Sequence, residues 1–147
     1  MKILIDTDVL IDFLYQREEF FENALRIISL IESKKVNGFV SSLIIWNLYY
    51  ILSKHLGSKV ARQKIKDFRS IINIIPIDDR IIDSALNSNI KDFEDSIQFF
   101  AAKNELIDII VTRNTKDYPK NIISIMSPKE FLNSLDQIVS NPVSSDN

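Results

Sequence analysis

Apolar positions along the chain follow two alternating spacings, and this alternation predicts the order of strands and helices. Short apolar runs rich in β-branched residues are typical of buried strands. They occur at Lys2–Ile5, 37–40, 70–77, 107–112 and 122–126. Longer stretches with apolar residues three and four positions apart are typical of amphipathic helices. They occur at 9–14, 18–35, 43–57, 58–70, 79–88 and 92–106, and a short final helix is expected from Ser127.

Polar residues at the ends of these stretches support the helix assignments. Thr7 and Asp8 are common N-cap residue types and precede the helix at 9–14, and Ser41 precedes the helix at 43–57. Gly57 is expected to end that helix, because glycine tolerates the backbone conformation of a helix C-terminus. Asp92 is expected to open the helix at 92–106.

The regular alternation of strands and helices predicts an α/β fold with a mostly parallel central sheet. Right-handed crossovers place helices on both faces of such a sheet, which gives three α/β/α layers. A length of 147 residues with 46% apolar content suits one domain. We expect this domain to span residues 1–139 and the polar residues 140–147 to form a disordered tail.

Composition narrows the chemistry that the chain can carry. It has no cysteine and a single histidine, His55, which excludes disulfides, thiolate zinc sites and multi-histidine metal sites. A metal would therefore be held by oxygen ligands, which favours Mg²⁺ or Mn²⁺. No apolar run approaches the roughly 20 residues that span a membrane, and no signal peptide is recognisable, so a cytoplasmic protein is expected.

Charge is distributed unevenly although the net charge is only −2. Basic residues gather between Lys54 and Arg69, and acidic residues gather between Asp78 and Asp95. The absence of a global basic field argues against nucleic-acid binding over the whole surface. The basic helix is a candidate contact for a phosphate backbone or, equally, a solvated amphipathic face.

Candidate site residues follow from the polarity of a parallel sheet. Ligand sites form beyond the carboxyl ends of the strands. Asp6 follows the first strand directly, and Thr112, Arg113 and Asn114 follow the strand at 107–112, with Asp117 shortly after. Asp108 begins its strand and is therefore expected at the opposite edge.

Acids at the start of two helices have a structural and a functional interpretation. Asp92 and Asp95 are three residues apart and share one helix face, whereas Glu94 is expected to point elsewhere. Either acid can cap its helix or bind a ligand. Asp8 is expected to be a cap and Asp12 to be solvent-exposed. Asn47 stands in an apolar helix, where a buried amide needs partners for its donor and its acceptor.

Four segments together resemble the PIN-domain family, including its small VapC-type toxins: "ILIDTDVLIDFL", "VSSLIIWNLYYIL", "DFEDSIQFFAA" and "IIVTRNTKDY". The resemblance implies a Mg²⁺- or Mn²⁺-dependent ribonuclease, with RNA as substrate, a homodimeric state and an antitoxin protein as partner. It assigns metal binding and catalysis to Asp6, Asp95, Asp92 and Asp117, and supporting roles to Thr112 and Asn114. Basic residues that it makes candidates for RNA contacts are Arg113, Lys116, Lys59 and Arg62.

Two positions depart from the family pattern. Asn47 stands where the family has a glutamate, and Asn114 where it often has an aspartate. Each amide is expected to orient a ligand or a water, but the site loses negative charge, and hard cations bind according to ligand charge. An alternative is therefore a catalytically weakened PIN-like domain that binds RNA or a protein partner without cleavage.

Two other classes share parts of this pattern. "DTDVL" resembles the DxD motif of haloacid-dehalogenase-type phosphatases, but Leu10 stands where that motif expects threonine or valine. A receiver-like signalling domain needs a phosphoacceptor aspartate at a mid-chain strand end, and residues 73–79 do not supply that context clearly.

Overall fold

The computed structural model of the chain describes residues 1–119 and 121–140. Within these residues, a five-stranded sheet has the order β3-β2-β1-β4-β5, and every neighbouring pair is parallel. The strands are β1 (Lys2–Ile5), β2 (Asn37–Ser41), β3 (Asn73–Ile75), β4 (Ile109–Val111) and β5 (Ser124–Met126). The α/β class and the parallel sheet expected from the sequence are confirmed.

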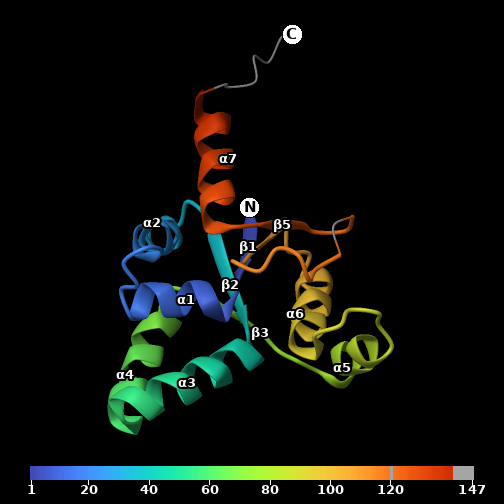
Figure 1. Cartoon of the computed structure of the whole chain (residues 1–147), viewed down its shortest axis with the longest axis horizontal. Helices are drawn as coiled ribbons and strands as arrows, with labels where there is room; N and C mark the ends of the chain where they lie inside the picture. Colours follow the sequence, from blue (N-terminus) through green and yellow to red (C-terminus); the bar gives the residue numbers. More distant parts are fainter. Residues whose placement is uncertain (120, 141–147) are drawn as a thin grey trace.

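Helices cover both faces of the sheet. They are α1 (Thr7–Leu14), α2 (Phe21–Glu32), α3 (Ser42–Leu56), α4 (Ser58–Arg69), α5 (Asp79–Leu86), α6 (Phe93–Asn104) and α7 (Pro128–Ser140). In Figure 1, α1 to α4 lie to one side of the sheet and α5 and α6 to the other. This is the result of right-handed crossovers, which first run outward from β1 to β3 and then return to β4.

The core is formed by the strands and the helix faces that pack on them. Ile3, Leu4 and Ile5 of β1 and Ile110 of β4 are completely buried, as expected for central strands covered on both faces. Burial of these apolar runs fixes the register of β1 against β4, with Ile5 paired to Val111. The register brings the residues that follow these two strands, Asp6 and Thr112, side by side.

Several helix boundaries differ from those expected from the sequence. The first helix begins at Thr7, and its N-cap is Asp6, not Thr7 or Asp8. The final helix is longer than expected and reaches Ser140, the first residue of the expected tail, while residues 141–147 lie outside the described residues. The caps expected at Ser41 and Asp92 are confirmed, since their side chains accept hydrogen bonds from Ile44 N and Asp95 N. Asp78 caps α5 in the same way and accepts from Ile81 N.

Asp108 lies at the amino end of β4, on the opposite sheet edge from Asp6. Its Oδ2 accepts a hydrogen bond from Lys2 N at 2.7 Å. This confirms its expected position at the opposite sheet edge. In the part of the chain that the structure describes, no helix is long and apolar enough to cross a membrane.

Candidate active site

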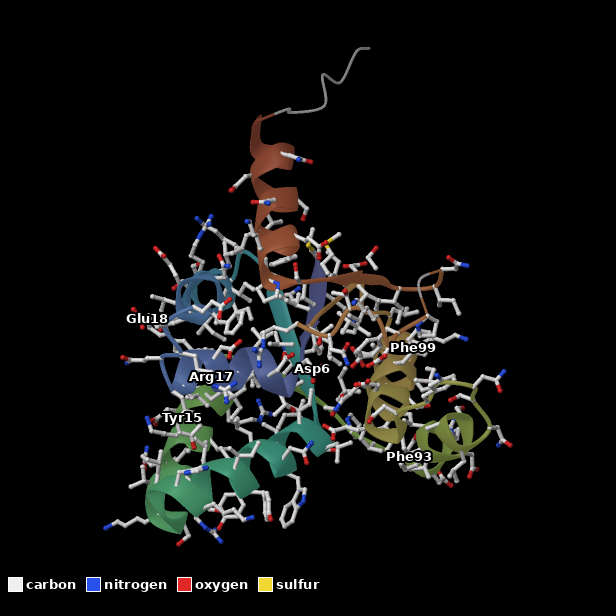
Figure 2. All side chains as sticks on the ribbon, in the orientation of Figure 1. Asp6, Tyr15, Arg17, Glu18, Phe93 and Phe99 are labelled. Atoms are coloured by element: carbon white, nitrogen blue, oxygen red, sulfur yellow. The ribbon has the colours of Figure 1, made fainter. Side chains whose placement is uncertain are left out.

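Asp6 lies at the centre of the carboxyl edge of the sheet, where β1 gives way to α1 (Figure 2). Its main-chain N donates to Val111 O at 3.0 Å, which ties it to the end of β4. Its carboxylate accepts two hydrogen bonds, from Thr7 N at 2.7 Å and from the buried Thr112 hydroxyl at 2.9 Å. Two neighbouring strand ends therefore hold one carboxylate in a fixed orientation.

A groove of about 450 Å³ opens above this edge. It lies against α1, the start of α6 and the loop after β4. Six acidic side chains line it: Asp6, Asp8, Asp92, Glu94, Asp95 and Asp117. The structure thus brings together the four acids that the sequence predicted, Asp6, Asp92, Asp95 and Asp117, and adds Asp8 and Glu94.

Asp92 and Asp95 are linked at the start of α6. Asp92 is the N-cap, and its Oδ1 accepts from Asp95 N at 3.0 Å. Asp95 in turn accepts from the hydroxyl of Tyr118 at 3.1 Å. Tyr118 is buried, with 3% of its surface exposed. The sequence did not indicate Tyr118, since it follows β4 in a loop without periodic pattern.

Glu94 lines the groove, so the expectation that it points elsewhere is wrong. Its Oε1 accepts from Asn47 Nδ2 of α3 at 2.5 Å. On α6 the Glu94 side chain does point in a different direction from those of Asp92 and Asp95. It still lines the groove, because it accepts a hydrogen bond from the Asn47 amide of α3 on the other side. Asn47 is half-buried rather than enclosed in the apolar core.

Asn114 makes the equivalent contact on the other side of the groove. Its Nδ2 donates to Asp117 Oδ2 at 2.5 Å, and its main-chain N donates to Thr112 Oγ1 at 3.1 Å. Both asparagines that stand in place of expected acids therefore donate to a carboxylate that lines the groove.

Asp12 is buried, so its expected exposure to solvent is also wrong. Only 1% of its side chain is exposed, and its Oδ2 lies 3.1 Å from Arg113 Nε. Asp8 lies 3.6 Å from the same nitrogen and accepts from Arg113 N at 3.0 Å, so it anchors the loop after β4 and is not a cap. Arg113 also lies over the ring of Phe20 at 4.4 Å. Its charge is thus paired inside the fold.

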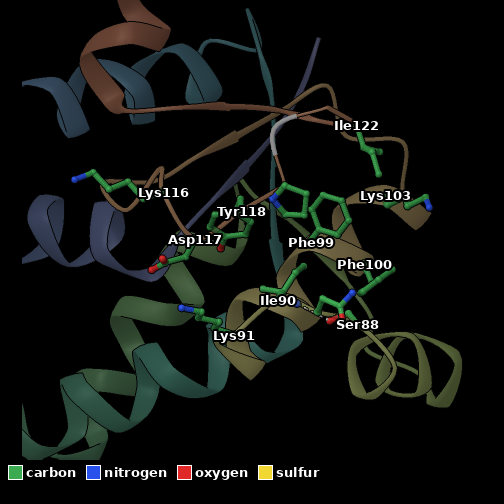
Figure 3. A pocket seen from close by; sticks show the side chains of 12 residues that line it. Ser88, Ile90, Lys91, Phe99, Phe100, Lys103, Lys116, Asp117, Tyr118 and Ile122 are labelled. Atoms are coloured by element: carbon green, nitrogen blue, oxygen red, sulfur yellow. Dashed lines mark hydrogen bonds between the residues drawn. The ribbon is translucent and has the colours of Figure 1, made fainter.

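The candidate RNA contacts lie in three different places. Arg113 lines the groove, but its partners are Asp8 and Asp12. Lys116 lines a neighbouring pocket of about 590 Å³ that shares Asp117 with the groove, as Figure 3 shows. Lys59 and Arg62 belong to α4, and neither lines the groove.

Burial, with a smaller contribution from neighbouring carboxylates, raises the pKa values of four acids in the groove. Burial raises the pKa of Asp6 above its ordinary value, although the hydrogen bond from Thr112 acts in the opposite direction. Burial, with a smaller effect of the Asp6 charge, raises the pKa of both Asp8 and Asp95 to about 6. Burial also raises the pKa of Glu94, next to the charges of Asp6 and Asp92. A cation in the groove would relieve this repulsion.

The donor atoms fit a hard divalent cation, since the acidic and amide oxygens around the groove are the ligand types that Mg²⁺ and Mn²⁺ prefer. In the structure these side chains are too far apart to coordinate one ion together. Among residues 1–119 and 121–140, no three acidic or histidine side chains converge closely enough to hold a metal ion. Asp92, Glu94 and Asp117 are exposed, so they have room to change rotamer.

Comparison with known proteins agrees with this architecture. The family model described as PIN domain matches residues 2–116, and the chain therefore belongs to the PIN-domain family. Among curated proteins, Ribonuclease VapC1 of Aquifex aeolicus (strain VF5) is 29% identical over 85 residues. That match spans 58% of this chain and 58% of the relative.

Solved structures show the same fold. The VapBC2 complex of Rickettsia felis, bound to a DNA fragment from its promoter, contains a chain with a TM-score of 0.66 and 18% identity. The match covers 86% of this chain and 98% of that one. A toxin–antitoxin complex from Klebsiella pneumoniae gives a TM-score of 0.65 at 24% identity, with 86% and 97% covered. These likenesses establish the three-layer fold.

Proposed function

We propose that the chain is a metal-dependent ribonuclease that hydrolyses RNA phosphodiester bonds in the acidic groove. The observation that carries the proposal is the gathering of Asp6, Asp92, Asp95 and Asp117 from three separate segments at the carboxyl edge of the sheet. Such a concentration of like charges is costly without a cation. Membership of the PIN-domain family and the relation to Ribonuclease VapC1 support the same reaction.

In this proposal Asp6 and Asp95 bind Mg²⁺ or Mn²⁺ directly, and Asp92 and Asp117 bind it directly or through water. A bound cation lowers the pKa of a water nucleophile and stabilises charge on the phosphoryl oxygens. Helix α3 carries Asn47 where the family has a glutamate, so it contributes no carboxylate to the groove. Glu94 of α6 contacts Asn47 and supplies a carboxylate at that place. The groove therefore keeps negative charge at the place where the family pattern is interrupted.

Polar neighbours hold these acids in position. Thr112 donates to Asp6, Tyr118 to Asp95, Asn47 to Glu94 and Asn114 to Asp117. Burial raises the pKa of the Tyr118 hydroxyl, so it stays protonated and remains a donor. Side chains that orient metal ligands in this way commonly affect metal affinity as much as some ligands do.

We further propose that the protein is the toxin of a toxin–antitoxin pair, that it forms a homodimer and that an antitoxin is its partner. Support comes from the relatives, since similar folds occur in the VapBC2 complex and in the toxin–antitoxin complex described above. An arm of such a partner with basic residues would match the charge of the groove.

A second candidate function is binding of RNA or a protein without cleavage. It is favoured by the two asparagines, since each one donates to an acid that would otherwise be free to bind a cation. The two functions differ in whether a divalent cation supports turnover.

Cleavage of a labelled RNA in Mn²⁺ distinguishes them. We expect the wild-type protein to cleave, EDTA to abolish cleavage, and Asp6→Asn to reduce the rate by about 10²-fold or more, as loss of a group that stabilises the transition state does. Asp108→Asn, an equivalent change at the opposite sheet edge, is the control and should cleave like the wild type. An RNA that is bound but never cut, with every cation tested, would establish the second function instead.

A further inference from the structure

The acidic groove has few cations with which to bind the phosphates of a long RNA. In residues 1–119 and 121–140, the cationic side chains that line it are Arg17 and Arg113. Arg113 pairs with Asp8 and Asp12. Arg17 lies 3.5 Å from Asp12 as well. If the chain cleaves RNA, as proposed above, most phosphates of a long substrate have to be bound outside the groove.

Helix α4 carries a row of four basic residues on one face. They are Lys59, Arg62, Lys66 and Arg69, and all four are exposed. Because an α-helix turns by about 100° per residue, these positions fall within an arc of about 80° and extend over about 15 Å. We call these four residues the basic stripe.

The opposite face of α4 fixes this helix to the rest of the fold. Ala61 and Phe68 are buried in the core, with 0% and 6% of their surfaces exposed. Helix α4 lies with α1 to α3 on one side of the sheet (Figure 1) and packs against α3. Every residue of α4 is described by the structure, and none of them lines the groove. The basic stripe is therefore a surface separate from the groove.

The charges of the basic stripe are not neutralised within the part of the chain that the structure describes. None of the ion pairs there includes a cation of α4. Asp67, the one acid of this helix, accepts a hydrogen bond from a glutamine of the same helix at 2.8 Å. Arg62 lies 5.9 Å from the ring of Tyr49, and Arg69 donates to a main-chain carbonyl at 2.8 Å. Both arginines are thus held in place without losing their charge.

The composition of the basic stripe favours a phosphate backbone over a protein or a membrane as its ligand. Protein interfaces are depleted in lysine and are built around apolar anchors. Val60, the exposed large apolar residue of α4, lies outside the stripe. A helix that binds to a membrane surface inserts its apolar face, whereas the apolar face of α4 is buried in the core. Aligned cations without an apolar member match the regularly spaced charges of a nucleic-acid backbone.

We propose that the basic stripe of α4 binds the phosphate backbone of a base-paired segment of the RNA substrate. A duplex hides the faces of its bases and is recognised through its shape and its backbone. Single strands are commonly held by stacking on aromatic rings, and the basic stripe contains no ring. This inference rests on the proposed ribonuclease function for the identity of its ligand.

The salt dependence of RNA binding tests this proposal directly, by anisotropy of a labelled 16-base-pair RNA duplex in EDTA. Affinity should fall with salt with a logarithmic slope of about −3 to −4, as expected for four phosphate contacts. Lys59→Gln and Lys66→Gln should each weaken binding by about fivefold at 100 mM salt and reduce the slope by about 1. Lys66→Arg, which keeps the charge, should bind like the wild type.

Lys103→Gln is the matched control, since it removes one exposed lysine from α6, on the other side of the sheet. Its affinity and its slope should equal those of the wild type, and circular dichroism checks that each variant is folded. Equal slopes for the wild type, Lys59→Gln and Lys66→Gln would overturn the proposal. So would a DNA duplex of the same sequence that binds more tightly than the RNA duplex.

An interface between copies of this chain is the remaining alternative use of the basic stripe. Sedimentation without RNA tests it, since a dimer that Lys66→Glu dissociates would overturn the proposal. A sedimentation coefficient that is the same for the wild type and Lys66→Glu supports the stripe as a surface for RNA.

The same measurements separate the basic stripe from the reaction. Duplex binding with the expected slopes, but without metal-dependent cleavage of any RNA, would overturn the ribonuclease function and leave the stripe standing. Metal-dependent cleavage with equal slopes in all variants would do the reverse. If both proposals hold, Lys66→Gln should raise the KM for a hairpin RNA by about fivefold and leave kcat near the wild-type value, because it removes binding that the substrate and the transition state share.

Discussion

Glu94 and Asn47 form the contact that distinguishes this groove from the acid pattern implied by the PIN-domain resemblance. The amide of α3 and the carboxylate of α6 lie 2.5 Å apart. A glutamate on α3 would have supplied charge directly. Here the helix supplies a donor, and the charge comes from the other wall of the groove.

We therefore predict that Glu94→Gln lowers Mn²⁺ affinity by about tenfold or more, a change comparable to the loss of a group that orients a metal ligand. Asn47→Ala should have a smaller effect in the same direction, because Glu94 stays but is no longer held. Mn²⁺ titration of the purified variants measures both.

Glu105→Gln is the matched control for this pair. Glu105 follows the same helix α6 but pairs with Lys2 at the opposite sheet edge, at 3.0 Å. Its replacement should leave Mn²⁺ affinity unchanged. Equal affinities for the Glu94→Gln and Glu105→Gln proteins would show that Glu94 has no part in the site.

For single residues, the sequence predicted the positions of side chains that directly follow strands. It did not predict the positions of side chains that depend on partners far away in the chain. Asp6 and Thr112 were predictable because parallel strands end at one edge. The burial of Asp12 was not, because its partner Arg113 arrives from the far side of the chain. Tyr118 was not predictable either, since only the folded loop brings its hydroxyl to Asp95.

Gly57 joins α3, which carries Asn47, directly to the basic helix α4. Its φ of 80° and ψ of 159° lie in a region that is essentially restricted to glycine. It both ends α3 and precedes Ser58, the first residue of α4.

We predict that Gly57→Ala lowers the free energy of unfolding by roughly 1–3 kcal/mol, the usual cost of such a conformation for a residue with a Cβ atom. Urea denaturation measures it. Ser58→Ala, one position further on, should change stability by no more than about 0.5 kcal/mol. Equal stability of the Gly57→Ala and Ser58→Ala proteins would show that a Cβ atom at position 57 causes no backbone strain.

Helices and strands of this fold were predictable where apolar residues recur at regular spacing or form a continuous run. The strands at β1 and β4 and the helix α3 follow directly from their apolar runs and from the caps at Ser41 and Gly57. The start of α1 differs from the expected one because Asp6 both caps the helix and lines the groove, whereas the sequence indicates Thr7 and Asp8 as caps.

The molecule as a whole concentrates negative charge at one end of its sheet, and this links its stability to pH. The pKa values of Asp8 and Asp95 are raised to about 6 from an ordinary 3.8, so the folded state binds protons more tightly than the unfolded chain. Protonation of these two carboxyls therefore stabilises the folded state. This contribution is complete below their ordinary pKa of 3.8 and is lost as the pH rises through about 6.

We predict that the metal-free protein melts at a lower temperature at pH 7.5 than at pH 5, by roughly a few degrees. Thermal unfolding followed by circular dichroism in EDTA measures the difference. Asp95→Asn removes one titrating group and should make the dependence shallower. A melting temperature that rises steadily from pH 5 to 7.5 would contradict the assignment of raised pKa values.

The central claim is that the acids at the carboxyl edge of the sheet bind a divalent cation for RNA hydrolysis, and calorimetric titration with Mn²⁺ tests it most directly. We predict measurable Mn²⁺ binding by the wild-type protein and by Asp108→Asn. Asp6→Asn and Asp95→Asn should each lose at least about tenfold in affinity, because affinity for hard cations depends on ligand charge. Mn²⁺ affinity that is the same in all four folded proteins would contradict the claim.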